Sequence, residues 1–330
     1  MLLKKKNTGI LYDIDKEIFN ELIETTAGVL RIPAVFIEKD YWVTYILNKL
    51  SKSIYKETAI FKGGTSLSKA YKIIDRFSED IDLAIITDGI DGNAVKRLIK
   101  NIEETLLDEN FEETTTPQTS KGSKFRKTVH QYPKIIEGDF GHANENLILE
   151  LNSFAKPNPY ISKTISSYIF DFLNTQSEEA KKLIGDFQLE PFEINVLDYK
   201  RTFCEKISAV ARASFEGDEV YSQLKEKIRH LYDIYHLMQE DEIKVFLNSD
   251  DMNSMIENVR EDDQRQFNSN WANVKLHSTK IFENINILDE LNSYYNSNFK
   301  TLVYSESLPN IEDIKIKFEE LSKILKEKDL

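Results

Sequence analysis

Two groups of residues in the stretch FKGGTSLSKAYKIIDRFSEDIDL, residues 61–83, could do chemistry together. The first group is Gly63 and Gly64, between a β-prone run and a helix-prone run. Glycines let the backbone turn tightly and approach a ligand without an intervening Cβ, and the unpaired N–H groups that open the next helix, near Thr65 and Ser66, can bind an anion. The loop matches neither a Walker loop nor a dinucleotide fingerprint, so an ordinary strand-to-helix turn is the alternative.

The second group is Asp80 and Asp82, which lie two residues apart in a predicted strand and therefore on the same face. Neighbouring carboxylates repel each other unless a cation lies between them, and Mg²⁺ prefers carboxylate oxygens and shares its shell with substrate phosphates. Glu150, on the polar face of the predicted strand LILELNSF, is the candidate third ligand. The alternatives are a solvated strand edge for the aspartates and a salt bridge to a helix for Glu150.

The spacing of apolar residues predicts the elements that must position these side chains. We expect two strands around the candidate site and two more after it, at residues 57–61, 80–87, 123–132 and 146–154. We expect helices over residues 14–50, with a break at Pro33, and over 66–75 and 94–107. The candidate residues would thus stand at the ends of neighbouring strands and at the start of a helix.

The segment KPNP, residues 156–159, is the candidate domain boundary. We expect N-terminal helices and a small core over residues 1–158 and a helical domain over residues 159–330. The helices expected in the second part cover residues 201–215, 220–239, 269–295 and 311–328, and the polar stretch 248–266 is expected to be an exposed loop or short helices. The expected fold class is α+β, a small mixed sheet with flanking helices followed by a helical domain.

Composition limits the classes of function. The chain has 330 residues and a net charge of −13, so no general basic field attracts nucleic acid and any such contact must use a local patch. The single cysteine excludes a disulfide framework and a cysteine-based zinc site. The lysines at the N-terminus are followed by no apolar segment, and no apolar run reaches membrane-spanning length. We therefore expect a cytoplasmic protein without a membrane partner.

One local basic patch does stand out. Residues 114–136 contain no Asp or Glu but hold Lys121, Lys124, Arg126, Lys127 and Lys134. Beside the metal site, such a strand pair would offer a positive surface to an RNA backbone. The alternative is a solvated edge strand whose lysines discourage aggregation.

These motifs resemble the AbiEii/AbiGii family of toxins, the MenT-like members of the DNA polymerase β-type nucleotidyltransferase superfamily. The likeness runs over about residues 35–240. It rests on KGGTS at 62–66 and FSEDIDL at 77–83, supported by EKDYWV at 38–43, EKISA at 205–209 and RHLYDIY at 229–235.

The resemblance implies roles for individual residues. Residues 62–66, namely Lys62, Gly63, Gly64, Thr65 and Ser66, would bind the phosphates of a nucleoside triphosphate. Asp80 and Asp82 would hold Mg²⁺ or Mn²⁺, with Glu150 as the third ligand. Lys206 would balance charge on the departing pyrophosphate, and Asp233 would orient Lys206 or the acceptor, or act as a base.

The residues themselves leave alternatives for the last two roles. Lys206 flanks the apolar stripe of its predicted helix, where a lysine usually just covers apolar surface with its stem. Arg229 and Asp233 stand four residues apart, a common spacing for a surface ion pair.

The resemblance further implies nucleotidyl transfer to an RNA such as tRNA, by the toxin of a type IV-like toxin–antitoxin or abortive-infection system with a separately encoded antitoxin. A non-catalytic nucleotide- or partner-binding protein on the same fold is one alternative. A nucleotidyltransferase acting on a small molecule or a protein is another.

Overall fold

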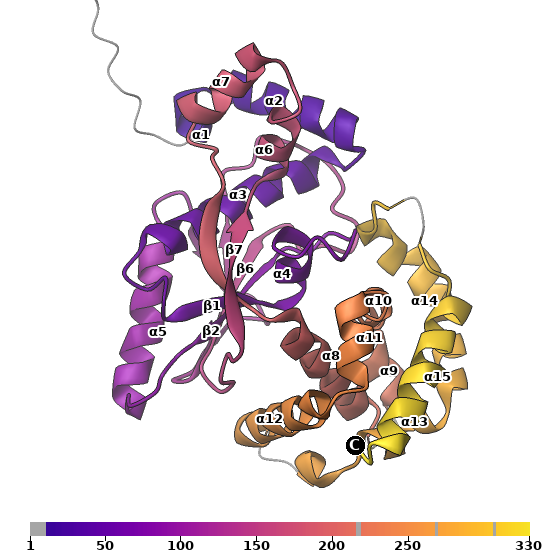
Figure 1. Cartoon of the computed structure of the whole chain (residues 1–330). Helices are drawn as coiled ribbons and strands as arrows, with labels where there is room; N and C mark the ends of the chain where they lie inside the picture. The colour runs from indigo at the N-terminus through magenta and orange to yellow at the C-terminus, as the bar shows by residue number, and fades with distance from the viewer. Residues whose placement is uncertain (1–10, 216–218, 268–269, 306–307) are drawn as a thin grey trace, which may run out of the picture.

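A central mixed sheet organises the first two thirds of the chain (Figure 1). The computed structural model describes residues 11–215, 219–267, 270–305 and 308–330, so the N-terminal lysines considered above lie outside the described residues. The strand order is β3-β5-β6-β2-β1-β8-β7, with β4 paired to β5. The strands are β1 (Ala59–Lys62), β2 (Asp80–Ile85), β3 (Glu112–Thr114), β4 (Ser120–Lys121), β5 (Phe125–Gln131), β6 (Leu147–Asn152), β7 (Tyr160–Ile165) and β8 (Phe192–Leu197).

The register of four central strands places charged residues side by side. β2 pairs antiparallel with β1 and parallel with β6, and β6 pairs antiparallel with β5. Lys62 is therefore opposite Asp82, Asp82 is opposite Glu150, and Glu150 is opposite Lys127. Side chains at paired positions share one face of a sheet, so this row has two neighbouring carboxylates, Asp82 and Glu150, with a lysine on either side.

The expected helical domain over residues 159–330 begins with two strands, β7 and β8, which were not predicted. These strands lie after KPNP, yet β8 pairs parallel with β1 and β7 pairs antiparallel with β8. The sheet therefore continues to Leu197, and the helical part begins only at Tyr199. β7 forms an edge of the sheet and leaves most of its side chains exposed, which removes the apolar pattern that would have identified it.

Helices flank the sheet as predicted for the N-terminal part. The helix expected over residues 14–50 forms as α2 and α3, with Arg31 in the left-handed conformation at the break and Pro33 at the cap of α3. In Figure 1, α1, α2, α6 and α7 gather at one end of the sheet. The helices of this part are α1 (Leu11–Ile14), α2 (Lys16–Leu30), α3 (Ala34–Lys52), α4 (Gly63–Lys69), α5 (Gly92–Leu106), α6 (Tyr168–Leu173) and α7 (Glu178–Asp186).

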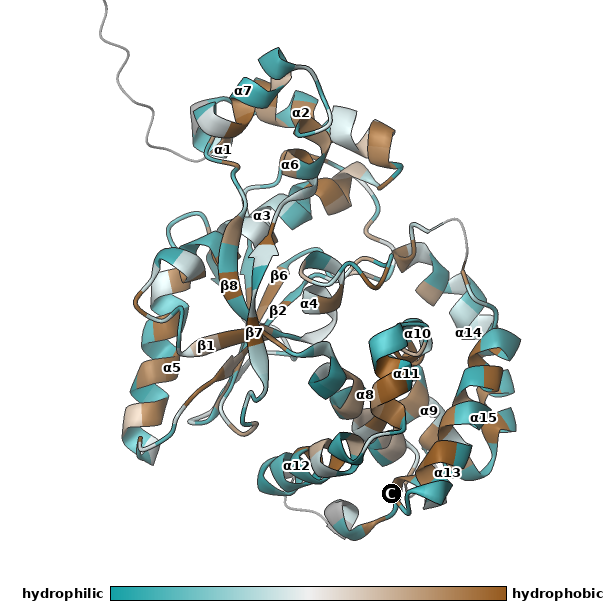
Figure 2. Ribbon diagram, in the orientation of Figure 1, coloured by the Kyte–Doolittle hydropathy of each residue, from teal (hydrophilic) through white to brown (hydrophobic). Residues whose placement is uncertain are grey.

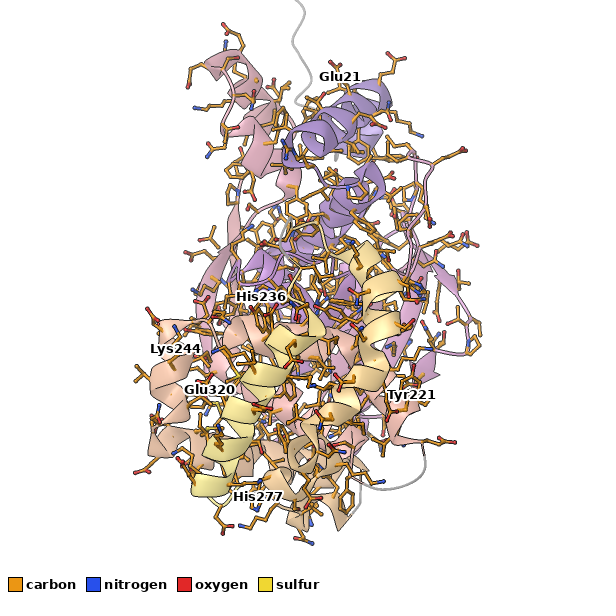
Figure 3. All side chains as sticks on the ribbon, turned by 90° about the vertical axis from the view of Figure 1, so that its right-hand side faces the viewer. Glu21, Tyr221, His236, Lys244, His277 and Glu320 are labelled. Carbon is orange, nitrogen blue, oxygen red and sulfur yellow. The ribbon has the colours of Figure 1, made fainter. Side chains whose placement is uncertain are left out.

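The last third of the described chain is helical. Figure 2 shows brown apolar faces turned inward between these helices, and in Figure 3 Lys244 and Glu320, both exposed, lie on the outside. The α-helices are α8 (Tyr199–Ala213), α9 (Val220–Glu226), α10 (Ile228–Leu237), α11 (Asp241–Leu247), α12 (Asp250–Phe267), α13 (Lys280–Glu283), α14 (Asn292–Ser297) and α15 (Ile311–Glu327). The 3₁₀ helices are η1 (Asn270–Asn273), η2 (Leu276–Ser278), η3 (Ile285–Leu291) and η4 (Phe299–Leu302). Among the described residues, no helix is both long and apolar enough to cross a membrane.

The segment predicted as an exposed loop or short helices, residues 248–266, instead contains the 18-residue helix α12. α12 packs on α8 and buries Met252, Ile256 and Val259. It also buries Asp262, which pairs with Arg201 of α8. The prediction from polar composition was wrong because some charged side chains of this segment are buried and paired rather than exposed to water.

The C-terminal part of the chain returns to the sheet part. The backbone N–H of Phe77 donates to the carbonyl of Leu302 at 2.7 Å, and that of Tyr304 donates to the carbonyl of Asp75 at 3.2 Å. Arg76 and Val303 form an isolated antiparallel bridge between these bonds. The helical part is thus tied to the connection that leads from the glycine loop to Asp80.

Candidate active site

The three predicted carboxylates lie in one cleft. Asp82 and Glu150 face each other in register on β2 and β6, and Asp80 lies two residues before Asp82 on β2. All three line a cleft of about 510 Å³, whose other wall comes from α8, α10 and α12. The alternative of a solvated strand edge does not fit, because the cleft is enclosed by both parts of the chain.

Burial and mutual repulsion perturb these carboxylates. Burial, with a further contribution from Glu79, raises the pKa of Asp80 to about 6. Burial, then the charges of Glu150 and Asp80, hold the pKa of Asp82 well above its usual range. A cation would relieve this repulsion.

The donor set fits a magnesium-type ion rather than a fully built protein cage. The Oδ1 atom of Asp80 is buried and has no hydrogen-bond partner. Mg²⁺ is usually held by one or two carboxylates, with waters and substrate phosphates completing its shell. Within the described ranges, no group of three or more His, Cys, Asp or Glu side chains is arranged to hold an ion by itself. The carboxylates therefore suit an ion that arrives with a phosphate ligand.

A side chain is excluded at each of the two glycines for a different geometric reason. α4 begins directly at Gly63, whose φ of +80° is in the left-handed region that favours glycine. A Cβ on Gly63 would lie 2.1 Å from the Oδ2 atom of Asp82, and one on Gly64 would lie 2.6 Å from a guanidinium nitrogen of Arg76. Lys62, Gly63 and Gly64 all line the cleft. The loop can pass this close to Asp82 and Arg76 only because it has no side chains there.

Thr65 and Ser66 are buried beneath the loop. The hydroxyl of Thr65 donates to the carbonyl of Asp80 at 2.6 Å, and that of Ser66 donates to the carbonyl of Gly63 at 2.8 Å. Neither residue lines the cleft. The Thr65 side chain fixes the start of α4 against β2, and the Ser66 side chain bonds within the first turn of α4. Lys62, Gly63 and Gly64 are the part of the predicted phosphate loop that faces the cleft.

Lys206 and Asp233 form a buried network with Arg76. Lys206 Nζ lies 2.8 Å from Asp233 Oδ2, and the Arg76 guanidinium donates to both Asp233 oxygens at 2.7 Å. Burial acts to raise the pKa of Asp233, but the charges of Arg76 and Lys206 outweigh it and hold that pKa below its usual range. Lys206 lines the cleft, whereas Asp233 is fully buried behind it. The Asp233 carboxylate is therefore held between Lys206 and Arg76, behind the cleft rather than in its wall.

A second chain of charges ties the loop to the helical part. Lys62 Nζ lies 2.6 Å from Glu205 Oε2, and Glu205 also meets Arg201 at 3.5 Å. Arg201 in turn pairs with Asp262 of α12. Adjacent residues of the EKISA motif thus serve different partners, with Glu205 holding the loop lysine and Lys206 held by Asp233.

Three charged residues at or behind the cleft lie within the motifs but were not predicted as site residues, and of these only Arg229 lines the cleft itself. Arg229 does not pair with Asp233 as its spacing suggested, but with Glu79 at 3.2 Å. Lys39 is fully buried, donates to the carbonyl of Asn144, and has its pKa lowered to about 8 by burial, against the opposing charges of Glu79 and Asp80. Their position inside the motifs EKDYWV, FSEDIDL and RHLYDIY is the sequence feature from which they could have been predicted.

The predicted basic patch is largely neutralised. Glutamates pair with all of its members except Lys124, for which no ion pair occurs among the described residues; the pairs are Lys121–Glu113, Arg126–Glu103, Lys127–Glu150 and Lys134–Glu145. The Arg126 side chain is only 14% exposed. Lys127 is the member that lines the cleft.

Comparisons with known proteins place this arrangement in a family. No curated protein matches the chain. Two crystal structures from Helicobacter pylori resemble it at 14% identity. JHP933 has a TM-score of 0.43, with 89% of this chain and 92% of that chain covered. A candidate nucleotidyltransferase has a TM-score of 0.45, with 88% and 94% covered.

The model of one family spans most of the sequence. It matches residues 45–318 and is described as nucleotidyl transferase AbiEii toxin, Type IV TA system. The matched range includes the glycine loop, the strand with Asp80 and Asp82, and both helices that carry Lys206 and Asp233. The chain therefore belongs to the AbiEii nucleotidyltransferase toxin family.

Proposed function

We propose that this chain transfers a nucleotide from a nucleoside triphosphate to an RNA such as tRNA, in the presence of Mg²⁺ or Mn²⁺. It would act as a toxin restrained by a separately encoded antitoxin. The observation that carries the proposal is that Gly63, Gly64, the carboxylates and Lys206 line one cleft between the sheet and the helical part. Membership of the AbiEii family supports the reaction class.

Each group in the cleft suits one part of a nucleotide. The backbone at Gly63 and Gly64, with Lys62, would bind the β- and γ-phosphates. Asp80 and Asp82, with Glu150, would hold the metal ion, which when bound offsets phosphate charge and lowers the pKa of the acceptor hydroxyl. Lys206, fixed by Asp233, supplies positive charge where the leaving group develops negative charge.

The proposed reaction is an in-line displacement at the α-phosphorus. The acceptor hydroxyl oxygen forms a bond to that phosphorus, and the bond from the phosphorus to the bridging oxygen of the β-phosphate breaks. Pyrophosphate leaves with the bonding electron pair, and the hydroxyl proton is released to solvent. The acceptor gains one nucleoside monophosphate unit and no electrons are exchanged with an oxidant or reductant.

The test is transfer of label from each of the four α-labelled nucleoside triphosphates to total RNA. Asp80→Asn and Asp82→Asn should each abolish product, because each change removes a carboxylate that would hold the metal ion beside the phosphates. Lys206→Ala should lower the rate by roughly two to three orders of magnitude, the usual size of a lost electrostatic contact to the transition state. Asp88→Asn, at an exposed position beyond the same strand, is the matched control and should keep the full rate.

Two outcomes would reject this proposal. Full transfer by a folded Asp80→Asn, Asp82→Asn double variant would remove the metal-site assignment. Binding of triphosphate without product from any RNA, protein or small-molecule acceptor would favour a non-catalytic nucleotide-binding protein.

A further inference from the structure

A cavity of about 130 Å³ lies in the sheet part, between α3 and the connection from α7 to β8. The residues of α3 that line it recur every three or four positions and so share one face of the helix: Tyr41, Thr44, Tyr45, Asn48, Lys49 and Lys52. The facing wall is formed by residues 187–190 and 192. Of the described residues, none lines both this cavity and the cleft, and in Figure 1 α7 lies at the top of the view and α12 near the bottom. The proposed transfer reaction therefore gives this cavity no role.

The inner part of the cavity is apolar and has the size of one ring. Tyr41, Phe187 and Leu189 are buried, and Phe192 is half-buried beside them. An apolar cavity of roughly 150 Å³ in another protein holds one benzene molecule. This cavity therefore admits a single aromatic ring and excludes a fused ring system such as a purine.

One hydrogen-bond acceptor in the wall has no partner. The hydroxyl of Thr44 donates to the carbonyl of Asp40 at 2.7 Å. The hydroxyl of Tyr45 donates to Asp108 at 2.6 Å. Among the described side chains that line the cavity, only Asn48 has a buried polar atom without a hydrogen-bond partner, namely Oδ1. A buried acceptor left unpaired costs free energy, which a ligand with an O–H or N–H group on its ring would recover.

Two opposite charges flank the cavity on its two walls. Lys52 on α3 and Glu190 on the facing connection both line the cavity and are both exposed. Neither forms an ion pair within the part of the chain that the structure describes. The other lysine of the lining, Lys49, is already paired with Asp108 at 2.9 Å. Lys52 is thus available to a carboxylate and Glu190 to an ammonium group.

We propose that this cavity binds a free aromatic amino acid whose ring carries a hydrogen-bond donor, with tyrosine as the best fit. The ring occupies the apolar interior, and its hydroxyl donates to Asn48 Oδ1. The α-carboxylate pairs with Lys52 and the α-ammonium group with Glu190. Lys52 lies one helical turn beyond Asn48, about 6 Å along the axis of α3, so the donor and the charged groups lie at opposite ends of the ring, as they do in tyrosine. A tyrosine inside a protein chain has neither charged group, which favours the free amino acid over a protein partner.

The first test follows the fluorescence of Trp42, whose ring centroid lies 5.3 Å from that of Tyr41 and 5.9 Å from that of Tyr45. In a Trp271→Phe protein, Trp42 is the one tryptophan left. Titration with L-tyrosine should give a saturable change, and L-phenylalanine should bind roughly threefold to tenfold more weakly, as expected for one lost hydrogen bond between neutral groups. Tyrosine should also raise the Tm of the wild type, because a ligand that binds only the folded state stabilises it.

Asn48→Leu should remove the preference for tyrosine over phenylalanine. Because this change also removes an unpaired buried acceptor, it should not lower the Tm of the protein without ligand. A lost preference with an unchanged or higher Tm would separate a ligand contact from damage to the fold.

The second test removes the charges of ligand and protein in matched pairs. Tyramine lacks the carboxylate and 3-(4-hydroxyphenyl)propionate lacks the ammonium group, and each should bind roughly threefold more weakly than tyrosine, the size expected for an exposed ion pair. Lys52→Gln should remove the difference between tyrosine and tyramine, and Glu190→Gln the difference between tyrosine and the propionate. Lys56→Gln and Glu193→Gln are the matched controls, because both residues are exposed and lie outside the lining. Both differences should persist in these controls.

Three results would overturn the inference. The first is the absence of both a saturable fluorescence change and a rise in Tm with tyrosine. The second is an unchanged preference for tyrosine over phenylalanine in folded Asn48→Leu. The third is binding of phenol as tight as that of tyrosine, which would leave an apolar cavity without recognition of an amino acid. None of these measurements involves the cleft, so they stand or fall separately from the proposed nucleotide transfer.

Discussion

Ion pairs with neighbouring side chains fix the position of the charged residues in the cleft. Lys206 reaches the cleft, but its position depends on Asp233, which also binds Arg76 behind the glycine loop. Breaking a buried ion pair by removing one partner leaves an uncompensated charge in a poorly solvated site. Loss of Asp233 would therefore leave two cations without their carboxylate, Arg76 of the sheet part and Lys206 of the helical part.

Asp233→Asn should lower the free energy of unfolding by about 3–5 kcal/mol, the usual cost of leaving buried charges unpaired. Because the pKa of Asp233 is lowered in the folded protein, its stabilisation is complete above its usual pKa of 3.8 and is lost as pH falls through the lower folded value. Thermal unfolding should therefore show a constant difference in Tm between wild type and variant from about pH 8 to 5, and a shrinking difference below about pH 4.

Asp241→Asn is the matched control for this change. Asp241 also pairs with a lysine, Lys244 at 2.8 Å, but its side chain is 97% exposed. Its Tm should equal that of the wild type at every pH. A Tm for Asp233→Asn equal to that of the wild type at pH 7 would show that Arg76 and Lys206 need no carboxylate between them.

At the scale of an element, the start of α4 sets the distance between the loop and the carboxylates. Gly63→Ala should abolish transfer, because the new Cβ would need φ +80° and would stand 2.1 Å from Asp82 Oδ2. Either the loop or Asp82 must move, and the site loses its geometry. Rates of transfer together with circular dichroism would show lost activity in a folded protein.

Gly28→Ala is the matched control, since a Cβ at Gly28, in the last turn of α2, meets nothing within 4 Å. It should keep full activity and raise stability by about 0.5–1 kcal/mol, the usual gain for replacing a helical glycine by alanine. Wild-type activity in Gly63→Ala would mean that the close approach to Asp82 does not matter for the reaction.

Elements with a strong local pattern were predicted well. β1, β2, β5 and β6 lie within the expected ranges or one residue beyond them, and the glycines stand at the junction of β1 and α4. β7 and β8 were missed because what makes them strands is their pairing with each other and with β1, which local periodicity does not report. α12 was missed because its buried Asp262 is matched by a charge on α8, far away in sequence.

The site was predictable to a similar extent. Spacing in one strand placed Asp80 and Asp82 together, but the register that sets Asp82 opposite Glu150 belongs to a pair of parallel strands more than sixty residues apart. The family resemblance supplied Lys206 and Asp233. The pairing of Asp233 with Arg76, and of Lys62 with Glu205, could not be deduced, because side-chain pairing between two parts of a chain depends on how the parts are packed.

At the scale of the whole molecule, ion pairs in and beside the cleft join the sheet part to the helical part. Lys62 binds Glu205, Arg76 binds Asp233, and Glu79 binds Arg229. The backbone bonds between residues 75–77 and 302–304 add a further link. The groups proposed to bind substrate therefore also fix the relative position of the two parts.

This arrangement predicts that the two parts unfold together. The two tryptophans report on them separately, because Trp42 is buried in α3 on the sheet side and Trp271 is buried in η1 on the helical side. In Trp42→Phe and Trp271→Phe variants, the remaining fluorescence should change at the same urea concentration, as in a cooperative transition. Adding Glu79→Gln and Glu205→Gln should separate the two midpoints, since both changes cut links across the cleft.

Glu178→Gln with Glu242→Gln removes the same charge from exposed ion pairs and is the control, in which the midpoints should still coincide. Nucleoside triphosphate with Mg²⁺ should raise both midpoints of the otherwise unchanged single-tryptophan proteins, because a ligand bound between the parts stabilises only the assembled state. Separate midpoints without any glutamate change would mean that the parts are independent. Coincident midpoints after Glu79→Gln and Glu205→Gln would assign the coupling to the backbone bonds at residues 302–304 instead of the charges in the cleft.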